Sequence, residues 1–79
     1  MTATFKALQE AIAEIQQQQQ YEPVSIVESS ELVAEIGLQS LDIAQLVAML
    51  EVKLEKDPFA NGATLESVTT AGQLSKLYE

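Results

Sequence analysis

Apolar residues recur every three or four positions at the start of the chain, as they do on the buried face of an amphipathic helix. This pattern predicts a helix over about 3–19, and Thr4 either caps that helix or lies just inside it. The glutamine run at 16–20 is short, so a solvated helix end explains it better than an adhesive tract does. The apolar positions are Phe5, Leu8, Ile12 and Ile15.

A second and stronger stripe of apolar residues predicts a helix from Ser40 to about Glu55. Pro58 closes this helix, since the residue before a proline is pushed out of the α region. The segment 64–67 fits a short helix, and 70–73 has the spacing of a capping box that opens a last helix through Tyr78. The stripe consists of Ile43, Leu46, Val47, Leu50 and Leu54.

The segment between the first two helices is predicted to be a long loop over 21–36. The segment 21–23, which ends in Pro23, stops the first helix. Residues 24–27 have strand composition, but a lone strand has no partner for its backbone groups. A helical turn around 31–35 is expected, and Gly37 then breaks the chain. Four apolar residues are expected to pin the loop to the core: Val24, Ile26, Leu32 and Ile36.

These elements predict an all-α fold in one domain spanning 1–79. We expect a small four-helix bundle of three main helices and one short helix, with the long loop between the first and second. An apolar content of 47% is enough for such a core and argues against disorder.

Composition and charge exclude several classes of protein. The 79 residues include 12 acidic and 4 basic side chains, no cysteine and no histidine, and the formal net charge is −8. The chain therefore lacks the commonest general base, most zinc ligands and the usual nucleophile–base pairs, and we do not expect an enzyme. The negative charge disfavours nucleic acid and membrane surfaces as partners. With neither a targeting segment nor a membrane span in the sequence, we expect a cytoplasmic monomer.

The acidity is unevenly distributed. Most of the net negative charge precedes Ser40, because only one of the four basic residues lies there, whereas the helix predicted after Ser40 is nearly neutral. The remaining acidic residues have no calcium-loop spacing, so we interpret them as solvated.

The most informative position is Ser40, which lies where a loop meets an amphipathic helix. The first N–H groups of a helix have no intrahelical partner, and the helix dipole favours negative charge there. A phosphate ester on the serine oxygen would occupy a ready-made anion site. An ordinary N-cap is the alternative, and the junction alone favours it.

The surroundings of Ser40 change that balance. The segment IGLQSLD at 36–42 and the C-terminal segment VTTAGQLSKLY at 68–78, taken with the helix order and the acidity, resemble the acyl carrier proteins. The peptidyl and D-alanyl carrier proteins are relatives within the same group, and the resemblance covers nearly the whole chain.

The resemblance implies that the protein carries a cargo and does not catalyse. A phosphopantetheinyl transferase would attach 4′-phosphopantetheine from coenzyme A to Ser40, and the thiol of that arm would hold the cargo as a thioester. Further expected partners are an acyl- or aminoacyl-loading enzyme and a ketosynthase or other condensing enzyme. The cargo itself stays open among acyl, malonyl and aminoacyl groups. The absence of cysteine fits an imported thiol.

The chain departs from the family pattern in two ways, and the second, the mixed outer face of the helix, points to a dedicated polyketide, nonribosomal peptide or specialised fatty-acyl pathway. Gln39 stands where the family usually has aspartate; because glutamine is a poor N-cap, Ser40 is expected to cap the helix itself. The exposed face of the helix is mixed and not strongly acidic. Met49 and Val52 on it either bind partners or contact the first helix or loop. The predicted partner-binding residues are Gln39, Leu41, Asp42, Gln45, Ala48, Met49, Glu51 and Val52.

Two further alternatives bear on function. The apolar residues Leu46, Leu50, Val68 and Leu74 either line a space for an acyl chain or form the core, and we interpret them as core. The protein could also be an unmodified acidic helical adaptor that binds a protein partner and uses Ser40 only as a helix cap.

Overall fold

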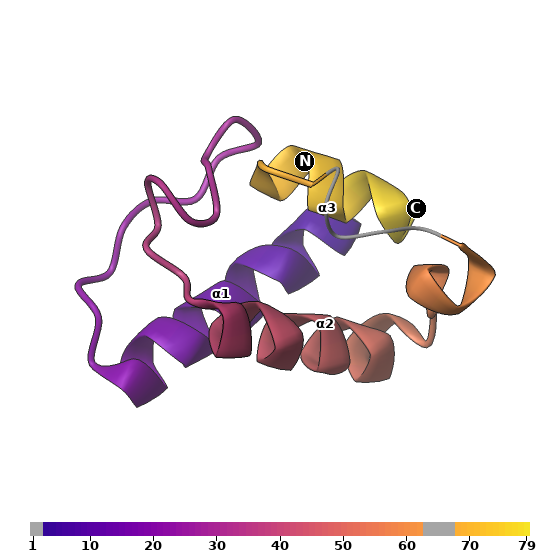
Figure 1. Ribbon diagram of the computed structural model, residues 1–79, viewed down its shortest axis with the longest axis horizontal. Coiled ribbons are helices and arrows are strands. Elements are labelled where there is room, and N and C mark those ends of the chain that lie inside the picture. The colour runs from indigo at the N-terminus through magenta and orange to yellow at the C-terminus, as the bar shows by residue number, and fades with distance from the viewer. Residues whose placement is uncertain (1–2, 63–67) are drawn as a thin grey trace.

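The computed structural model describes residues 3–62 and 68–79. Within these ranges the protein is all-helical, and its only β feature is a single antiparallel bridge between Glu31 and Thr70 (Figure 1). The short helix predicted at 64–67 lies outside the described residues. The elements are α1 (Ala3–Gln19), α2 (Ser40–Leu54), the 3₁₀ helix η1 (Pro58–Asn61) and α3 (Ala71–Leu77).

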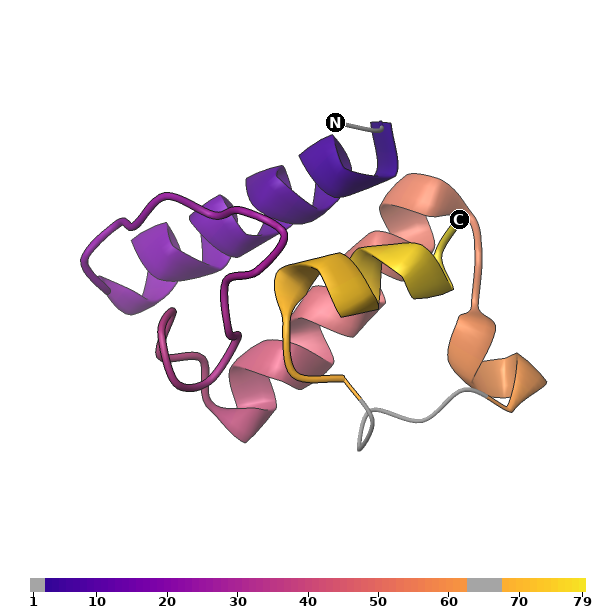
Figure 2. The same cartoon turned by 90° about the horizontal axis from the view of Figure 1, so that it is seen from above.

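Helix α1 packs against both α2 and α3 (Figures 1 and 2). Residues 20–39, which we call the long loop, leave the end of α1, pass the start of α3 and return to the start of α2 (Figure 2). The predicted bounds of the first helix are confirmed, and the second helix ends one residue earlier than expected.

Both long helices end through residues in the left-handed conformation, not directly through a proline. After α1, Gln20 has φ of 61°, and the N–H of Tyr21 donates to the carbonyl of Gln16 at 2.8 Å. After α2, Glu55 has φ of 55°. At α1, the left-handed Gln20 and the hydrogen bond from Tyr21 to Gln16 together form a Schellman-type closure. The first helix therefore ends just before the predicted stop segment 21–23, and the closure uses Tyr21 and not Pro23.

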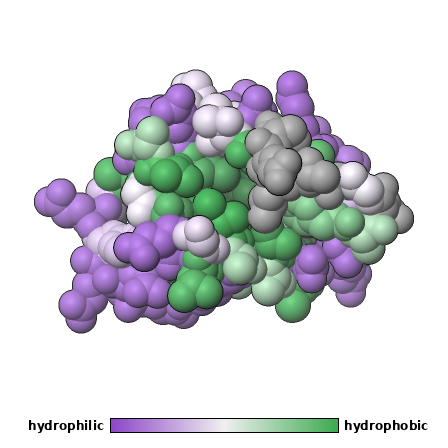
Figure 3. Space-filling model, in the orientation of Figure 1, coloured by the Kyte–Doolittle hydropathy of each residue, from purple (hydrophilic) through white to green (hydrophobic). Residues whose placement is uncertain are grey.

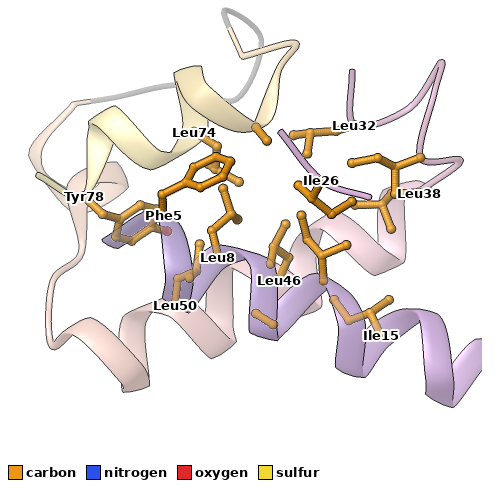
Figure 4. Packing of buried hydrophobic residues seen from close by; sticks show 14 residues of the cluster. Phe5, Leu8, Ile15, Ile26, Leu32, Leu38, Leu46, Leu50, Leu74 and Tyr78 are labelled. Carbon is orange, nitrogen blue, oxygen red and sulfur yellow. The ribbon is translucent and has the colours of Figure 1, made fainter. Parts of the chain in front are cut away.

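The core forms where side chains from all three helices and the long loop converge (Figure 4). All four apolar positions predicted on α1 are buried. On α2, Leu46 and Leu50 are buried, whereas Ile43 and Leu54 are half-buried against the core and Val47 is half-buried. Leu74 on α3, interpreted from the sequence as a core residue, is fully buried, as are Leu46 and Leu50.

Three of the four predicted anchors of the long loop are buried: Ile26, Leu32 and Ile36. Val24 is not an anchor, since 44% of it is exposed. The loop reaches the core at Ile26, whose carbonyl accepts a 2.8 Å hydrogen bond from Nε2 of Gln9, after the earlier contact of Tyr21 with the core. Val24 lies between these two contacts and stays outside. The expected helical turn is present, because the N–H groups of residues 35 and 36 both donate to the carbonyl of Glu31.

The start of α3 is joined to the long loop through backbone hydrogen bonds. The N–H of Leu32 donates to the carbonyl of Thr69, and the N–H of Gly72 donates to the carbonyl of Glu28 at 2.8 Å. A Cβ atom on Gly72 would lie 2.9 Å from that same carbonyl oxygen, so only glycine allows this approach. The predicted capping box of α3 is confirmed, because Thr70 and Gln73 exchange backbone-to-side-chain hydrogen bonds.

A matched pair of substitutions tests how the long loop is anchored. Leu32→Ala removes a buried side chain and should lower the free energy of unfolding by about 2–5 kcal/mol. Val24→Ala changes an exposed side chain and should shift it by less than about 0.5 kcal/mol. Urea denaturation followed by circular dichroism measures both, and equal losses would contradict the assigned anchors.

Tyr78 generates a second stability prediction. Its ring is buried and packs edge-to-face on Phe59, with 6.3 Å between ring centroids. Burial raises the pKa of its phenol to about 12, and its hydroxyl makes no hydrogen bond within the described residues. Because a buried hydroxyl without a partner costs free energy, Tyr78→Phe should raise the free energy of unfolding by about 1 kcal/mol. A loss of stability in the same urea measurement would show that the hydroxyl has a partner.

Candidate functional site

Ser40 is the first residue of α2, and its side chain is exposed. The residue in the N-cap position is Gln39, with φ of −94° and ψ of 171°. Its N–H donates to Oδ2 of Asp42 at 2.9 Å, and its carbonyl accepts the first helical hydrogen bond from the N–H of Ile43. The expectation that Ser40 caps the helix is therefore wrong, because Gln39 and Asp42 cap it between them.

The backbone before Ser40 turns through Gly37, whose φ is 84°. This left-handed conformation follows the helical turn of the long loop and strongly favours glycine. The next residue, Leu38, is buried and donates its N–H to the carbonyl of Leu32 at 3.0 Å. Anchoring Leu38 in the core fixes where α2 begins and leaves Ser40 at the surface.

Asp42 was expected on the outer or edge part of α2, among the partner-binding residues, but only 2% of it is exposed. Its Oδ2 atom accepts the hydrogen bond from the N–H of Gln39 and a second one, at 2.7 Å, from the hydroxyl of Tyr21. A carboxylate in a buried position needs such donors, since burying a charge without partners is costly. Asp42 is thus occupied inside the protein and does not face a partner.

Tyr21 is the residue of this site that the sequence did not reveal. Its partner Asp42 is 21 positions away, and no local pattern links the two. The hydrogen bond to Asp42, together with burial and the charge of that carboxylate, raises the pKa of the Tyr21 phenol. The hydroxyl therefore keeps its proton, and remains a donor, throughout the neutral range.

An apolar cavity of about 510 Å³ lies beside Ser40. It opens between the start of α2, the turn of the long loop and the residues just before α3, and Figure 3 shows apolar residues gathered across the middle of this face. Val68, interpreted from the sequence as core, is half-buried and contributes to the wall. The described lining residues are Leu32, Val33, Ala34, Ser40, Ile43, Val68 and Thr69.

The outer face of α2 is apolar at two prominent positions, since Leu41 is 84% and Val52 is 80% exposed. Ala48 between them is exposed as well. Met49 is half-buried and packs partly against the core, which leaves less of it for a partner than the sequence suggested. Gln45 is half-buried, and its Nε2 donates to Oε1 of Gln18 on α1 at 2.7 Å.

Glu51 is directed toward the segment that follows α2. Burial, the charge of Asp57 and a hydrogen bond with it raise the pKa of the Glu51 carboxyl. Lys53, by contrast, lies on the side of α1, with its Nζ 4.0 Å from a carboxylate oxygen of Glu10. Glu51 is half-buried, so only part of its side chain is available to a docking partner.

Neither a metal centre nor a membrane segment is found in the part of the chain that the structure describes. Residues 3–62 and 68–79 contain no group of three acidic, histidine or cysteine side chains that could hold a metal ion. In the same ranges, no helix has both the length and the apolar character needed to cross a membrane. Comparisons with protein-family models, curated proteins and solved structures find no match.

The raised pKa of Glu51 predicts a pH-dependent effect of Glu51→Gln. A carboxyl whose folded pKa lies above its unfolded value stabilises the fold fully only below the unfolded value, and that contribution is lost as pH rises through the folded pKa. Glu51→Gln should therefore have the higher Tm at neutral pH, and the difference should vanish in acid. Thermal melts across this range measure it, and a lower Tm of the variant at neutral pH would contradict the assignment.

Proposed function

We propose that the protein is a carrier protein of the four-helix acyl carrier type, with 4′-phosphopantetheine attached to Ser40. The observation that carries the proposal is that Ser40 stands exposed at the first position of a 15-residue helix while other residues provide the cap. A serine that is free of capping and lies at the positive end of a helix dipole suits a phosphodiester. The transferase would join the serine oxygen to the pantetheine phosphate, accept the serine proton and release the adenosine bisphosphate half of coenzyme A.

The cavity beside Ser40 supports an acyl cargo with an apolar part. Its volume of about 510 Å³ falls within the range of roughly 300–1,000 Å³ typical of small-molecule sites. Val33, Ile43 and Val68 give it apolar walls, and Ser40 lies on its edge. Among the cargoes left open by the sequence, a hydrocarbon acyl group suits such walls better than a charged aminoacyl or malonyl group does.

The outer face of α2 is the proposed docking surface for the transferase, the loading enzyme and the condensing enzyme. Leu41 and Val52 stand at its two ends, and their exposure supports apolar docking contacts. A partner with mixed apolar and weakly basic chemistry fits this nearly neutral helix, as in a dedicated biosynthetic pathway. Gln39, Gln45, Ala48, Met49 and Glu51 complete the surface, whereas Asp42 is buried and is left out of it.

An unmodified acidic adaptor is the second candidate function. Two exposed apolar residues on α2 would serve it equally well. Its account of Ser40 as a helix cap is not supported, because Gln39 occupies the N-cap position. The two functions therefore differ in whether Ser40 is modified.

The test is intact mass spectrometry after incubation with coenzyme A and a phosphopantetheinyl transferase of broad specificity. The parent protein should gain the mass of one phosphopantetheine, and Ser40→Ala should gain nothing. Ser29→Ala, which alters an exposed serine in a turn of the long loop, is the matched control and should be modified like the parent. An unmodified parent would overturn the carrier proposal and leave the adaptor.

A further inference from the structure

A short chain of hydrogen bonds joins the end of α1 to the turn that holds Ser40. The hydroxyl of Tyr21 donates to Oδ2 of Asp42 at 2.7 Å, and the same oxygen accepts the N–H of Gln39 at 2.9 Å. One carboxylate oxygen therefore fixes two backbone segments at once. Gln39 immediately precedes Ser40, so the chain of contacts ends beside the serine itself.

Tyr21 and Asp42 are both held in place by the rest of the fold. The N–H of Tyr21 donates to the carbonyl of Gln16 at 2.8 Å, and the Tyr21 side chain packs partly against the core. Asp42 is 2% exposed, so water has little access to replace a lost donor. Removing the Tyr21 hydroxyl would thus leave a buried carboxylate with fewer hydrogen bonds, a costly state that favours rearrangement of the carboxylate.

We infer that Tyr21 is a positioning residue: its hydrogen bond to Asp42 holds the turn at Gln39 and thereby sets how fast Ser40 is modified. The inference rests on the proposed function. When Asp42 moves, the N–H of Gln39 loses its fixed partner and the first turn of α2 loosens. Transfer of a phosphoryl group needs the serine oxygen in line with the bond that breaks, and a displacement of about 1 Å can cost roughly a hundredfold in rate.

The inference separates two kinetic constants. Tyr21 lies outside the proposed docking surface, and Gln39 is the one docking residue that its loss would loosen, so Tyr21→Phe should change the KM of the transferase for the protein far less than its kcat. Its kcat should fall by about ten- to a hundredfold, because the alignment of Ser40 is disturbed and not the docking. In an Asp42→Ala background, Tyr21→Phe should have no further effect on kcat, since the residue through which it acts is gone.

The experiment compares parent, Tyr21→Phe and Tyr78→Phe as full chains. Steady-state kinetics with coenzyme A and the transferase give kcat and KM, and hydrogen exchange by NMR reports the amides of Gln39 and Leu74. Tyr78→Phe is the matched control, because it deletes the same hydroxyl at a buried position outside the site. It should retain the parent kcat. In Tyr21→Phe, exchange at Gln39 should accelerate about tenfold or more, while exchange at Leu74, in the core, should stay as in the parent.

The outcomes distinguish the inference from the proposed function. A parental kcat in Tyr21→Phe overturns the inference and leaves the carrier function standing. Equal acceleration of exchange at Gln39 and Leu74 also overturns it, because it would indicate a general loss of stability. A parent that is not modified overturns the proposed function together with the rate effect, and exchange at Gln39 then decides separately whether Tyr21 holds the turn.

Discussion

The apolar face of α1 is the surface on which the rest of the molecule is built. Helices α2 and α3 both pack against α1, and the long loop places Ile26 and Leu32 in the same core (Figure 4). The chain has no cysteine, so no disulfide stabilises the fold. A domain of this size buries only about 60% of its unfolded surface, so a single continuous core must supply nearly all of the stability.

This dependence explains the form of the long loop. A connection without a helix of its own must satisfy its backbone groups elsewhere. Here they bond to Gln9 of α1 and to the start of α3, where the absence of a side chain at Gly72 permits the approach to Glu28. At the end of the loop, the N–H of Gln39 is satisfied in the same way by a helix residue, Asp42 of α2. Because Gln39 and Asp42 cap α2, Ser40 is not needed as a cap and stays exposed.

The three α-helices could be predicted from the sequence because each buries a stripe of side chains at helical period, as Phe5 and Leu8 illustrate on α1. Helix ends were harder to predict. Proline indicates where a helix cannot continue, but Gln20 and Glu55 end the helices earlier in left-handed conformations that their residue types do not announce. The prediction that Val24 is an anchor is wrong for a related reason, since hydropathy alone does not say which apolar residues of a loop reach the core.

At the candidate site, the sequence identified Ser40 through its junction and its neighbours, but placed Asp42 on the outside. An aspartate is exposed in most proteins, and the burial of Asp42 is favoured by a distant donor, Tyr21, in addition to the local N–H of Gln39. Such a pair becomes apparent only once the fold has brought the two residues together.

The same pair gives the protein a built-in optical reporter. The chain has two tyrosines and no tryptophan, so its near-ultraviolet absorption and emission come chiefly from Tyr21 and Tyr78. The phenol of Tyr21 donates a hydrogen bond to the carboxylate of Asp42, and the phenol of Tyr78 is enclosed in the core beside Phe59. Because a hydrogen-bonded carboxylate quenches phenol fluorescence, each ring reports on a different part of the molecule. Loss of the hydrogen bond between Tyr21 and Asp42 should therefore raise the tyrosine emission of the protein, without an attached dye.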